Sequence, residues 1–223
     1  RTTVEANVLE GGSCVINAQK FLQSVKVMSG DEITLSVNDR LAVSIMSGKS
    51  NYRMSALPAA DFPALPALRT ELGFTLPSSV LRKMINKVSY AMGVNDQRII
   101  LNGTYFKVND GDLLCVACDS FRLAKSEKKL EFGRINDDRD ALHFAYVVPA
   151  KTINELCRML PDDDELTVAV YMGRKHMVYV IEGLTFFTRL IEGEYIDYDR
   201  IIIKNHRIIV ECPREALLMA LEK

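Results

Sequence analysis

Hydrophobic positions between residues 77 and 160 alternate between helical and strand periods. A helical stripe follows Pro77, and Gly93 stands where such a helix would end. A second stripe starts after Pro149. We expect Ser78 or Ser79 to cap the first helix, because a hydroxyl can accept a free N–H of the first turn. The stripes are Val80, Leu81, Met84, Ile85, Val88 and Ile153, Leu156, Cys157, Leu160.

Short segments of strand composition lie between and after these helices. Residues 109–112 are typical of a hairpin turn. Two helices packed on mostly antiparallel strands predict an α+β fold. The expected strands are 99–101, 105–108, 113–117, 122–126 and further strands that start near Leu166, Met177 and Thr185.

Parts of this pattern recur at a period of about 130 residues. Residues 14–21 resemble 146–153, and residues 31–37 resemble 164–170 in the same order. The segment 74–77 resembles 210–213. Ordered matches at a nearly constant offset indicate a duplicated module. The expected domains are the C-terminal half of a first copy in 1–66, a complete second copy in 70–200 and the truncated start of a third in 205–223.

Composition restricts the class of protein. The 223 residues are 48% hydrophobic and 26% charged, as in soluble globular proteins. Lys+Arg 28 against Asp+Glu 29 gives a net charge of -1, so any site for a polyanion must be local. The apolar runs are too short to cross a bilayer and none resembles a signal peptide, which predicts a cytoplasmic protein. The odd number of cysteines, 5, favours reduced thiols.

Positive charge gathers on the polar faces of the predicted helices. Solvated helix faces alone could explain this pattern. A cationic face on an otherwise negative chain would also attract a polyanion from one side. The cations are Lys20 and Lys26 on 17–28, Arg82, Lys83 and Lys87 on 78–92, and Lys151 and Arg158, beside Glu155, on 149–160.

Two motifs allow other kinds of chemistry. Cys115 and Cys118 have the spacing of half a zinc site or of a redox pair, but no second ligand pair exists and the surrounding run is strand-like. The acidic residues 162–165 could bind a hard cation, although adjacent carboxylates on a turn are usually solvated. We expect no metal, no cofactor and no catalytic residues. A zinc or thiol enzyme and a generic interaction scaffold are the alternatives.

Four segments together resemble a known family. Residues 118–124, with 101–103, 57–63 and 193–198, closely resemble the beta subunit of bacterial DNA polymerase III, the replicative sliding clamp. The resemblance implies three similar clamp domains per subunit and a head-to-tail homodimer closed around duplex DNA. It implies a non-catalytic processivity factor in DNA replication. Its expected partners are double-stranded DNA of any sequence, the DNA polymerase III alpha subunit, the clamp loader, and other clamp-binding polymerases and repair proteins.

The resemblance also assigns roles to residues. It implies DNA binding by Lys26, Arg82, Lys83, Lys87, Arg98, Lys151 and Arg158. It implies a pocket for hydrophobic peptide tails at Leu101, Cys118, Ser120, Phe121, Arg122, Leu123, Ile196, Arg200 and Ile201. It implies subunit contact at Lys20, Tyr52 and Met54. The chain departs from the family at Ile196 and Ile203, where proline is common, and at Phe121, which replaces histidine or tyrosine.

Overall fold

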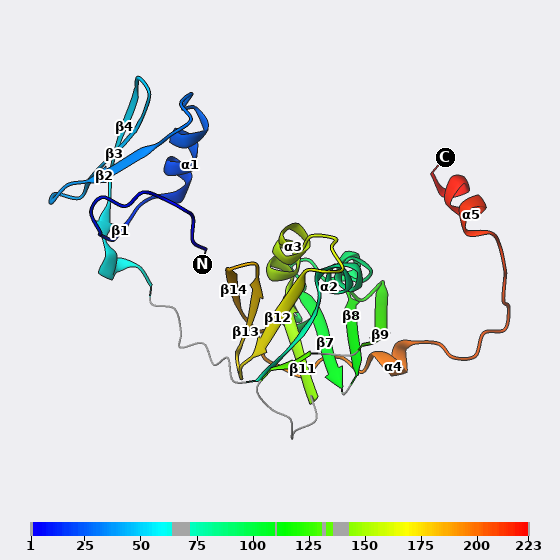
Figure 1. The fold of residues 1–223 in the computed structure, drawn as a ribbon. Coiled ribbons are helices and arrows are strands. Elements are labelled where there is room, and N and C mark those ends of the chain that lie inside the picture. The colour runs from blue at the N-terminus through cyan, green and yellow to red at the C-terminus, as the bar shows by residue number, and fades with distance from the viewer. Residues whose placement is uncertain (1, 64–71, 110, 131–132, 136–142, 223) are drawn as a thin grey trace. The chain divides into compact units, whose positions relative to one another are not determined.

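The computed structural model describes residues 2–63, 72–109, 111–130, 133–135 and 143–222. The chain divides into two compact units, Thr3–Leu68 and a larger one that contains Arg69–Lys223 (Figure 1). Each unit is described by itself. Among the described residues, no helix has the length and apolar character needed to cross a membrane.

The smaller unit packs one helix and short strands around a small core. Its buried apolar residues are Val43, Ile45 and Ala56, and Phe21 of the helix packs against them. The Asn17 side chain accepts the Lys20 N–H at 2.9 Å and so caps this helix. The elements are β1 (Cys14–Val15), α1 (Ala18–Lys26), β2 (Thr34–Val37), β3 (Ala42–Ser47), β4 (Ser50–Ser55), β5 (Leu57–Pro58) and the 3-10 helix η1 (Ala59–Asp61). β2, β3 and β4 form one antiparallel sheet, and β1 pairs with β5.

The larger unit contains two antiparallel sheets. One has the order β10-β6-β12-β13-β14 and the other β11-β7-β8-β9. The strands are β6 (Gly73–Pro77), β7 (Gly103–Asn109), β8 (Asp112–Cys118), β9 (Leu123–Lys129), β10 (Gly133–Ile135), β11 (His143–Pro149), β12 (Thr167–Met172), β13 (His176–Ile181) and β14 (Leu184–Arg189). The helices are α2 (Ser78–Asn86), α3 (Ala150–Met159), α4 (Tyr198–Ile201) and α5 (Arg214–Leu221), with 3-10 helices η2 (Ser89–Ala91) and η3 (Ile99–Leu101).

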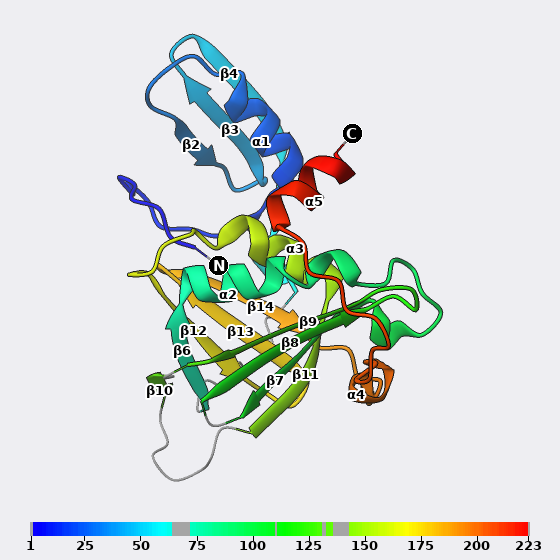
Figure 2. The ribbon, with the colours of Figure 1, turned by 90° about the vertical axis from the view of Figure 1, so that its right-hand side faces the viewer.

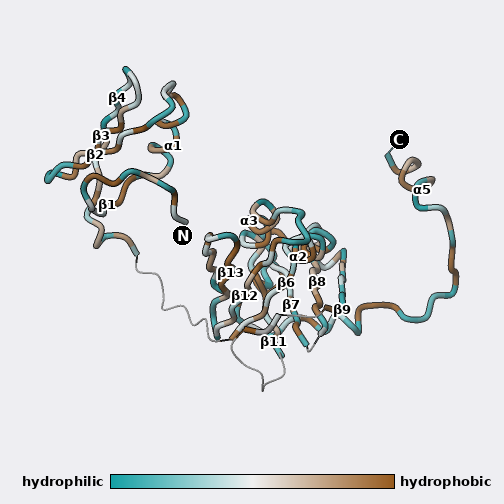
Figure 3. Tube along the Cα trace, in the orientation of Figure 1, coloured by the Kyte–Doolittle hydropathy of each residue, from teal (hydrophilic) through white to brown (hydrophobic). Residues whose placement is uncertain are grey.

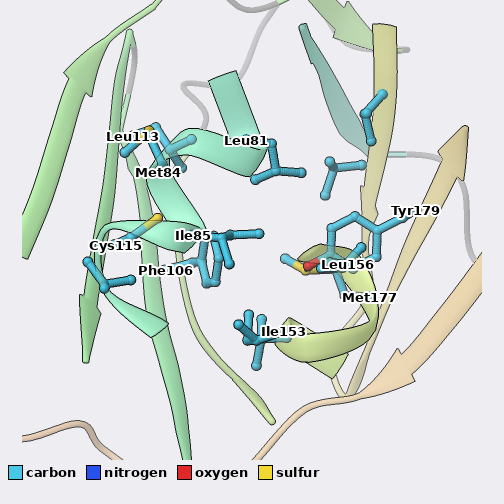
Figure 4. Close-up of a cluster of buried hydrophobic side chains, with 14 of the residues drawn as sticks. Leu81, Met84, Ile85, Phe106, Leu113, Cys115, Ile153, Leu156, Met177 and Tyr179 are labelled. Carbon is cyan, nitrogen blue, oxygen red and sulfur yellow. The ribbon is translucent and has the colours of Figure 1, made fainter. Parts of the chain in front are cut away.

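One hydrophobic core joins both sheets to α2 and α3. Figure 2 shows the two helices beside each other across one end of the sheets. Burial alternates along β7, where Phe106 and Val108 face inward, as the period of a strand requires. Figure 4 shows Ile85 of α2 and Ile153 of α3 among the side chains of this core. Removing this apolar surface from water is the main favourable contribution to folding of the unit.

The α+β fold is confirmed, and so are the two main helices and most strands. The expected strand 99–101 is wrong, because this segment forms η3. Gly93 N–H donates to the Leu101 carbonyl at 2.8 Å, and the Asn102 side chain bonds both the N–H and the carbonyl of Asp96 at 2.9 Å. These bonds close the segment on itself, so it joins no sheet.

The expected serine cap of α2 is also wrong. Pro77 occupies the cap position and makes no side-chain cap bond. Ser78 and Ser79 are the first helical residues, and their hydroxyls donate to the Pro161 carbonyl and to Asp164. Their N–H groups donate to the carbonyls of Leu166 and Asp163 at 2.7 and 3.1 Å. The free donors of the first turn are therefore satisfied by a loop distant in sequence.

The expected hairpin at 109–112 agrees with the pairing of Asn109 with Asp112. Asp110 lies outside the described residues, and Gly111 has φ +86°, a conformation that glycine adopts without strain.

The two units repeat one order of elements. β1 and α1 precede β2, β3 and β4, as β11 and α3 precede β12, β13 and β14. The Val15–Leu57 pair in the smaller unit corresponds to the Val147–Ile191 bridge in the larger one. Pro213 occupies the N-cap position of α5, as Pro77 does in α2. The segment that precedes α5 contains hydrophobic residues, coloured brown in Figure 3, and Ile208, Ile209 and Val210 in it are exposed.

Candidate nucleic-acid interface and peptide pocket

α2 and α3 direct their polar faces to solvent. Lys83 and Lys87 are exposed on or just after α2, and Lys151 and Arg158 are exposed on α3. The inward faces bury Leu81, Ile85 and Ile153 in the core, which fixes the opposite faces outward. The two helices contact each other, so their cations form one surface, the α2–α3 face. Lys26 is exposed at the end of α1 in the other unit.

The cations of the α2–α3 face differ in their partners. Lys83 Nζ lies 3.1 Å from Asp162, and Arg158 Nη1 lies 3.0 Å from Glu155. Arg82 is half-buried and donates to the Leu160 carbonyl at 2.8 Å. Lys87 and Lys151 form no ion pair with any residue that the structure describes. These two ammonium groups are consequently available to an external anion without loss of an internal partner.

The turn between β8 and β9 is held by one carboxylate. Asp119 Oδ1 accepts the N–H groups of Phe121 and Arg122 at 3.1 and 2.8 Å. Asp119 Oδ2 accepts the Arg122 Nε and Nη2 donors at 2.9 and 2.6 Å. The hydrogen bonds from Arg122 lower the pKa of Asp119 to about 2. On this turn the Phe121 side chain is 96% exposed.

A stack of tyrosines holds the segment before α4 against the sheet. The rings of Tyr105 and Tyr195 are 4.9 Å apart and inclined by 8°. Tyr198 lies 6.0 Å from Tyr105, and Lys125 Nζ lies 6.0 Å from the Tyr198 ring centroid. Burial raises the pKa of Tyr195, which also interacts with Cys118. This stack fixes the position of the chain that carries Ile196 and leads into α4.

The expected pocket residues lie on η3, on the β8–β9 hairpin and on the segment that leads into α4. Leu101 and Cys118 are buried, so in a peptide pocket they could only lie beneath the exposed side chains. Cys118 pairs with Leu123 across the β8–β9 hairpin, and Gly193 lies next to Ile100. Leu123 and Ile196 are half-buried, whereas Ser120, Phe121, Arg122, Arg200 and Ile201 are exposed. The stacking residues Tyr105 and Tyr195 were missed as part of this region, because only the tertiary structure brings them into contact.

Arg98 lies at this same region. Its guanidinium donates to Asp96 at 3.3 Å and also to the Ser120 hydroxyl. Hydrogen bonds from Arg98 lower the pKa of Asp96. The resemblance implies DNA binding by Arg98; in the structure its side-chain partners are Asp96 and Ser120, and Ser120 is one of the expected pocket residues.

The smaller unit has an open surface hollow of about 300 Å³ between α1 and β4. Lys20, Tyr52 and Met54, the expected subunit-contact residues, all line it. Gln23 and Arg53 also line it. Gln23 lies one helical turn from Lys20, so both side chains share one face of α1.

The two cysteines of the C-x-x-C motif lie on β8 and are buried. Burial raises the pKa of Cys115, which keeps it a thiol, whereas a thiol redox site needs a lowered pKa. The described part of the chain contains no group of three or more His, Cys, Asp or Glu side chains placed to hold a metal ion.

Comparisons with known proteins agree on one family. The family model "DNA polymerase III beta subunit, central domain" matches residues 75–197, and the model of the N-terminal domain matches residues 1–66. The Beta sliding clamp of Halalkalibacterium halodurans is 32% identical over 97% of this chain and 56% of its own length. That of Bacillus subtilis is 29% identical over 95% of this chain and 54% of its own length.

Solved structures give the same result. The DNA polymerase III subunit beta of Pseudomonas aeruginosa superposes with a TM-score of 0.81 at 30% identity, covering 91% of this chain and 54% of that one. The DNA polymerase sliding clamp of Bacillus subtilis superposes with a TM-score of 0.81 at 29% identity, covering 89% of this chain and 50% of that one. The chain thus spans about half the length of the relatives it matches. Because the central-domain model alone covers more than half of the sequence, the chain belongs to the DNA polymerase III beta subunit family.

Proposed function

We propose that this chain is part of a sliding clamp, a non-catalytic processivity factor of bacterial replication. The observation that carries the proposal is the α2–α3 face, where exposed cations stand on two adjacent helices whose other sides are buried. Such a face attracts a polyanion while the net charge of the whole chain remains -1. The clamp would be cytoplasmic and would encircle duplex DNA as a homodimer.

The chemistry of the α2–α3 face suits sliding. Lysine and arginine attract phosphates regardless of sequence, and phosphate contacts alone do not read bases. Lys83, Lys87, Lys151 and Arg158 would contribute directly, Arg82 less so because its guanidinium is bound to the Leu160 carbonyl. Lys26 would contribute from α1. Weak attraction of this kind lets the protein move along DNA while the closed ring prevents its loss.

The expected pocket residues on η3, on the β8–β9 hairpin and on the segment leading into α4 would bind the hydrophobic tails of partner proteins. Leu123, Ile196 and Ile201 would contact an aliphatic or aromatic anchor, and Arg122 and Arg200 would border it. Partners of this class are the DNA polymerase III alpha subunit, the clamp loader, and other clamp-binding polymerases and repair proteins. Phe121, exposed on the turn between β8 and β9, would add aromatic surface at the rim of this pocket.

The hollow on the smaller unit would take part in subunit contact. Lys20, Tyr52 and Met54 would contact a second subunit there. We further propose that residues 1–66 are the C-terminal half of a first clamp domain, 70–200 a second clamp domain and 205–223 the start of a third. The matching element orders of the two units support this division.

Retention on DNA of different topology tests the proposal. We expect the full-length protein, once loaded on a nicked circular plasmid, to stay bound through gel filtration in moderate salt. Cutting the plasmid at one site should release it, because a ring slides off a free end. Equal retention on cut and uncut plasmid would contradict encirclement and indicate ordinary binding.

A further inference from the structure

Residues 161–165, the acidic loop, lie between α3 and β12 and carry four carboxylates. The loop is bonded to the first turn of α2. The Ser78 hydroxyl donates to the Pro161 carbonyl at 2.8 Å. The Ser79 N–H donates to the Asp163 carbonyl at 3.1 Å. The backbone of the acidic loop is therefore held where α2 begins and α3 ends, beside the cations of the α2–α3 face.

The acids of this loop have different partners. Asp163 accepts a backbone N–H of the loop itself at 2.8 Å. Asp164 accepts the Ser79 hydroxyl, and this hydrogen bond together with the charge of Lys83 lowers the pKa of Asp164. Asp162 lies 3.1 Å from the Lys83 ammonium, and both of these side chains are more than half exposed. The charge of Asp162 can therefore be removed without loss of a bond that shapes the loop.

The cations of the α2–α3 face fall into two groups. Lys83 and Arg158 have counter-charges, Asp162 for the first and Glu155, at 3.0 Å, for the second. Both pairs lie toward the acidic loop, because α3 ends just before it and α2 begins against it.

The second group has no such partners in the part of the chain that the structure describes. Lys87 follows Lys83 by one helical turn, and Lys151 lies in the first turn of α3. Each of these two lysines is farther along its helix from the acidic loop than the paired cation. The α2–α3 face is thus neutralised near the loop and positive away from it.

An acid beside a cation weakens the attraction of a polyanion in two ways. The carboxylate reduces the charge that the cation presents, and it repels the phosphate directly. Salt limits both effects to about 8 Å at physiological ionic strength. Only acids on the α2–α3 face itself should therefore affect DNA binding there, whereas an exposed acid elsewhere on the protein should not.

We propose that Asp162 and Glu155 are counter-charges that reduce the contribution of Lys83 and Arg158 to DNA binding, so that Lys87 and Lys151 make the main phosphate contacts and the attraction stays weak enough for sliding. This inference rests on the proposed function. Loss of either acid would add a phosphate contact to the face. An added contact slows movement along the duplex, because it must break at each step.

Asp162→Asn tests the inference, since it keeps the size of the side chain and removes its charge. In buffer without divalent cations, we expect the full-length variant to bind a duplex oligonucleotide about three- to tenfold more tightly, and the salt slope to steepen by about 1. Glu155→Gln should act in the same direction. Asp199→Asn removes the same charge from an exposed acid on α4 and should leave the affinity unchanged. Equal effects of Asp162→Asn and Asp199→Asn would overturn the inference.

A double-mutant cycle shows whether Asp162 acts through Lys83. Lys83→Ala should cost little affinity in the wild type. In the Asp162→Asn protein it should cancel the gain in affinity and return the salt slope to its earlier value. Additive effects of the two substitutions would refute the assigned pairing. Unchanged melting temperatures are expected, because an exposed ion pair contributes little to stability.

Release from cut DNA measures the effect on sliding. After loading on a nicked plasmid and cutting at one site, Asp162→Asn should leave the free ends more slowly than the wild type. Release at the wild-type rate despite tighter binding would contradict a role in sliding. A wild-type protein whose DNA affinity does not depend on salt would instead count against the α2–α3 face as a DNA surface, and so against the proposed function.

Discussion

The Asp119 carboxylate accepts two backbone N–H groups and the Arg122 guanidinium at the same time. Only the ionised form can accept all of these bonds, which is why the pKa is lowered. The Asp162 carboxylate acts differently: it lies 3.1 Å from the Lys83 ammonium and partly neutralises a charge on the helix surface. At this scale single acids determine both the shape of a turn and the charge available on a helix.

Replacing Asp119 should change how stability depends on pH. The folded pKa of about 2 is below the ordinary value, so Asp119 stabilises the fold above roughly pH 4 and loses this contribution as pH falls toward 2. Asp119→Asn should therefore be less stable than the wild type at pH 6, with the difference shrinking below pH 4. Urea unfolding of both proteins between pH 6 and pH 2.5 measures this. Asp199→Asn, at an exposed acid, is the control, and a pH-independent difference between Asp119→Asn and the wild type would contradict the expectation.

Two lysines of the α2–α3 face should contribute unequally to DNA binding. Lys87→Ala should weaken binding to a duplex oligonucleotide and lower the salt slope by about 1. Lys83→Ala should have a smaller effect, because Asp162 already neutralises part of its charge. Salt titrations followed by fluorescence anisotropy compare the two variants directly. Equal losses of DNA affinity in the two variants would contradict the expectation and show that the Lys83–Asp162 ion pair opens freely when DNA binds.

Helices α2 and α3 illustrate what an element contributes beyond its own residues. Their apolar spacing was sufficient to predict them, because a helix in a folded domain must bury one face. Their starts were harder to predict: the first turn of α2 is satisfied by the loop between α3 and β12, not by a serine cap. η3 replaced an expected strand because Asn102 and Gly93 bond within their own segment. Local propensity does not contain such long-range partners.

The inward face of α3 should be essential for the larger unit. Ile153 is fully buried and lies with Phe106 and Ile85 in the core shown in Figure 4. Ile153→Ala should lower the free energy of unfolding by about 2–5 kcal/mol, from lost burial and the cavity it leaves. Asn154→Ala, on the exposed side of the same helix, should change it by less than about 0.5 kcal/mol. Chemical denaturation of both variants checks this, and similar values for the two would be inconsistent with the packing.

At the scale of the molecule, each unit has its own core. The larger core draws on both sheets and two helices, whereas the smaller one has Val43, Ile45 and Ala56 as its buried members. A small core supplies little stabilisation against the entropy of ordering the chain. The smaller unit of this 223-residue chain should therefore be the less stable of the two.

Ile45→Ala should act on the smaller unit alone. Ile45 is fully buried in that core, so the substitution should greatly increase hydrogen exchange in β2, β3 and β4. Exchange in β7, β8 and β12 should stay as in the wild type. Mass spectrometry of proteolytic fragments resolves the two regions. Increased exchange in both would mean that the cores unfold together.

The amino-acid sequence was sufficient to predict the α+β class, the positions of α2 and α3 and the cations on their outer faces, because periodicity and charge are local properties of the chain. Which of those cations have internal partners depends on the three-dimensional packing of the chain. This packing placed Asp162 beside Lys83, and it placed Arg98 on Ser120 at the turn where Phe121 is exposed. Such contacts join residues far apart in the chain, and their geometry depends on how sheets and loops pack, which no local pattern specifies.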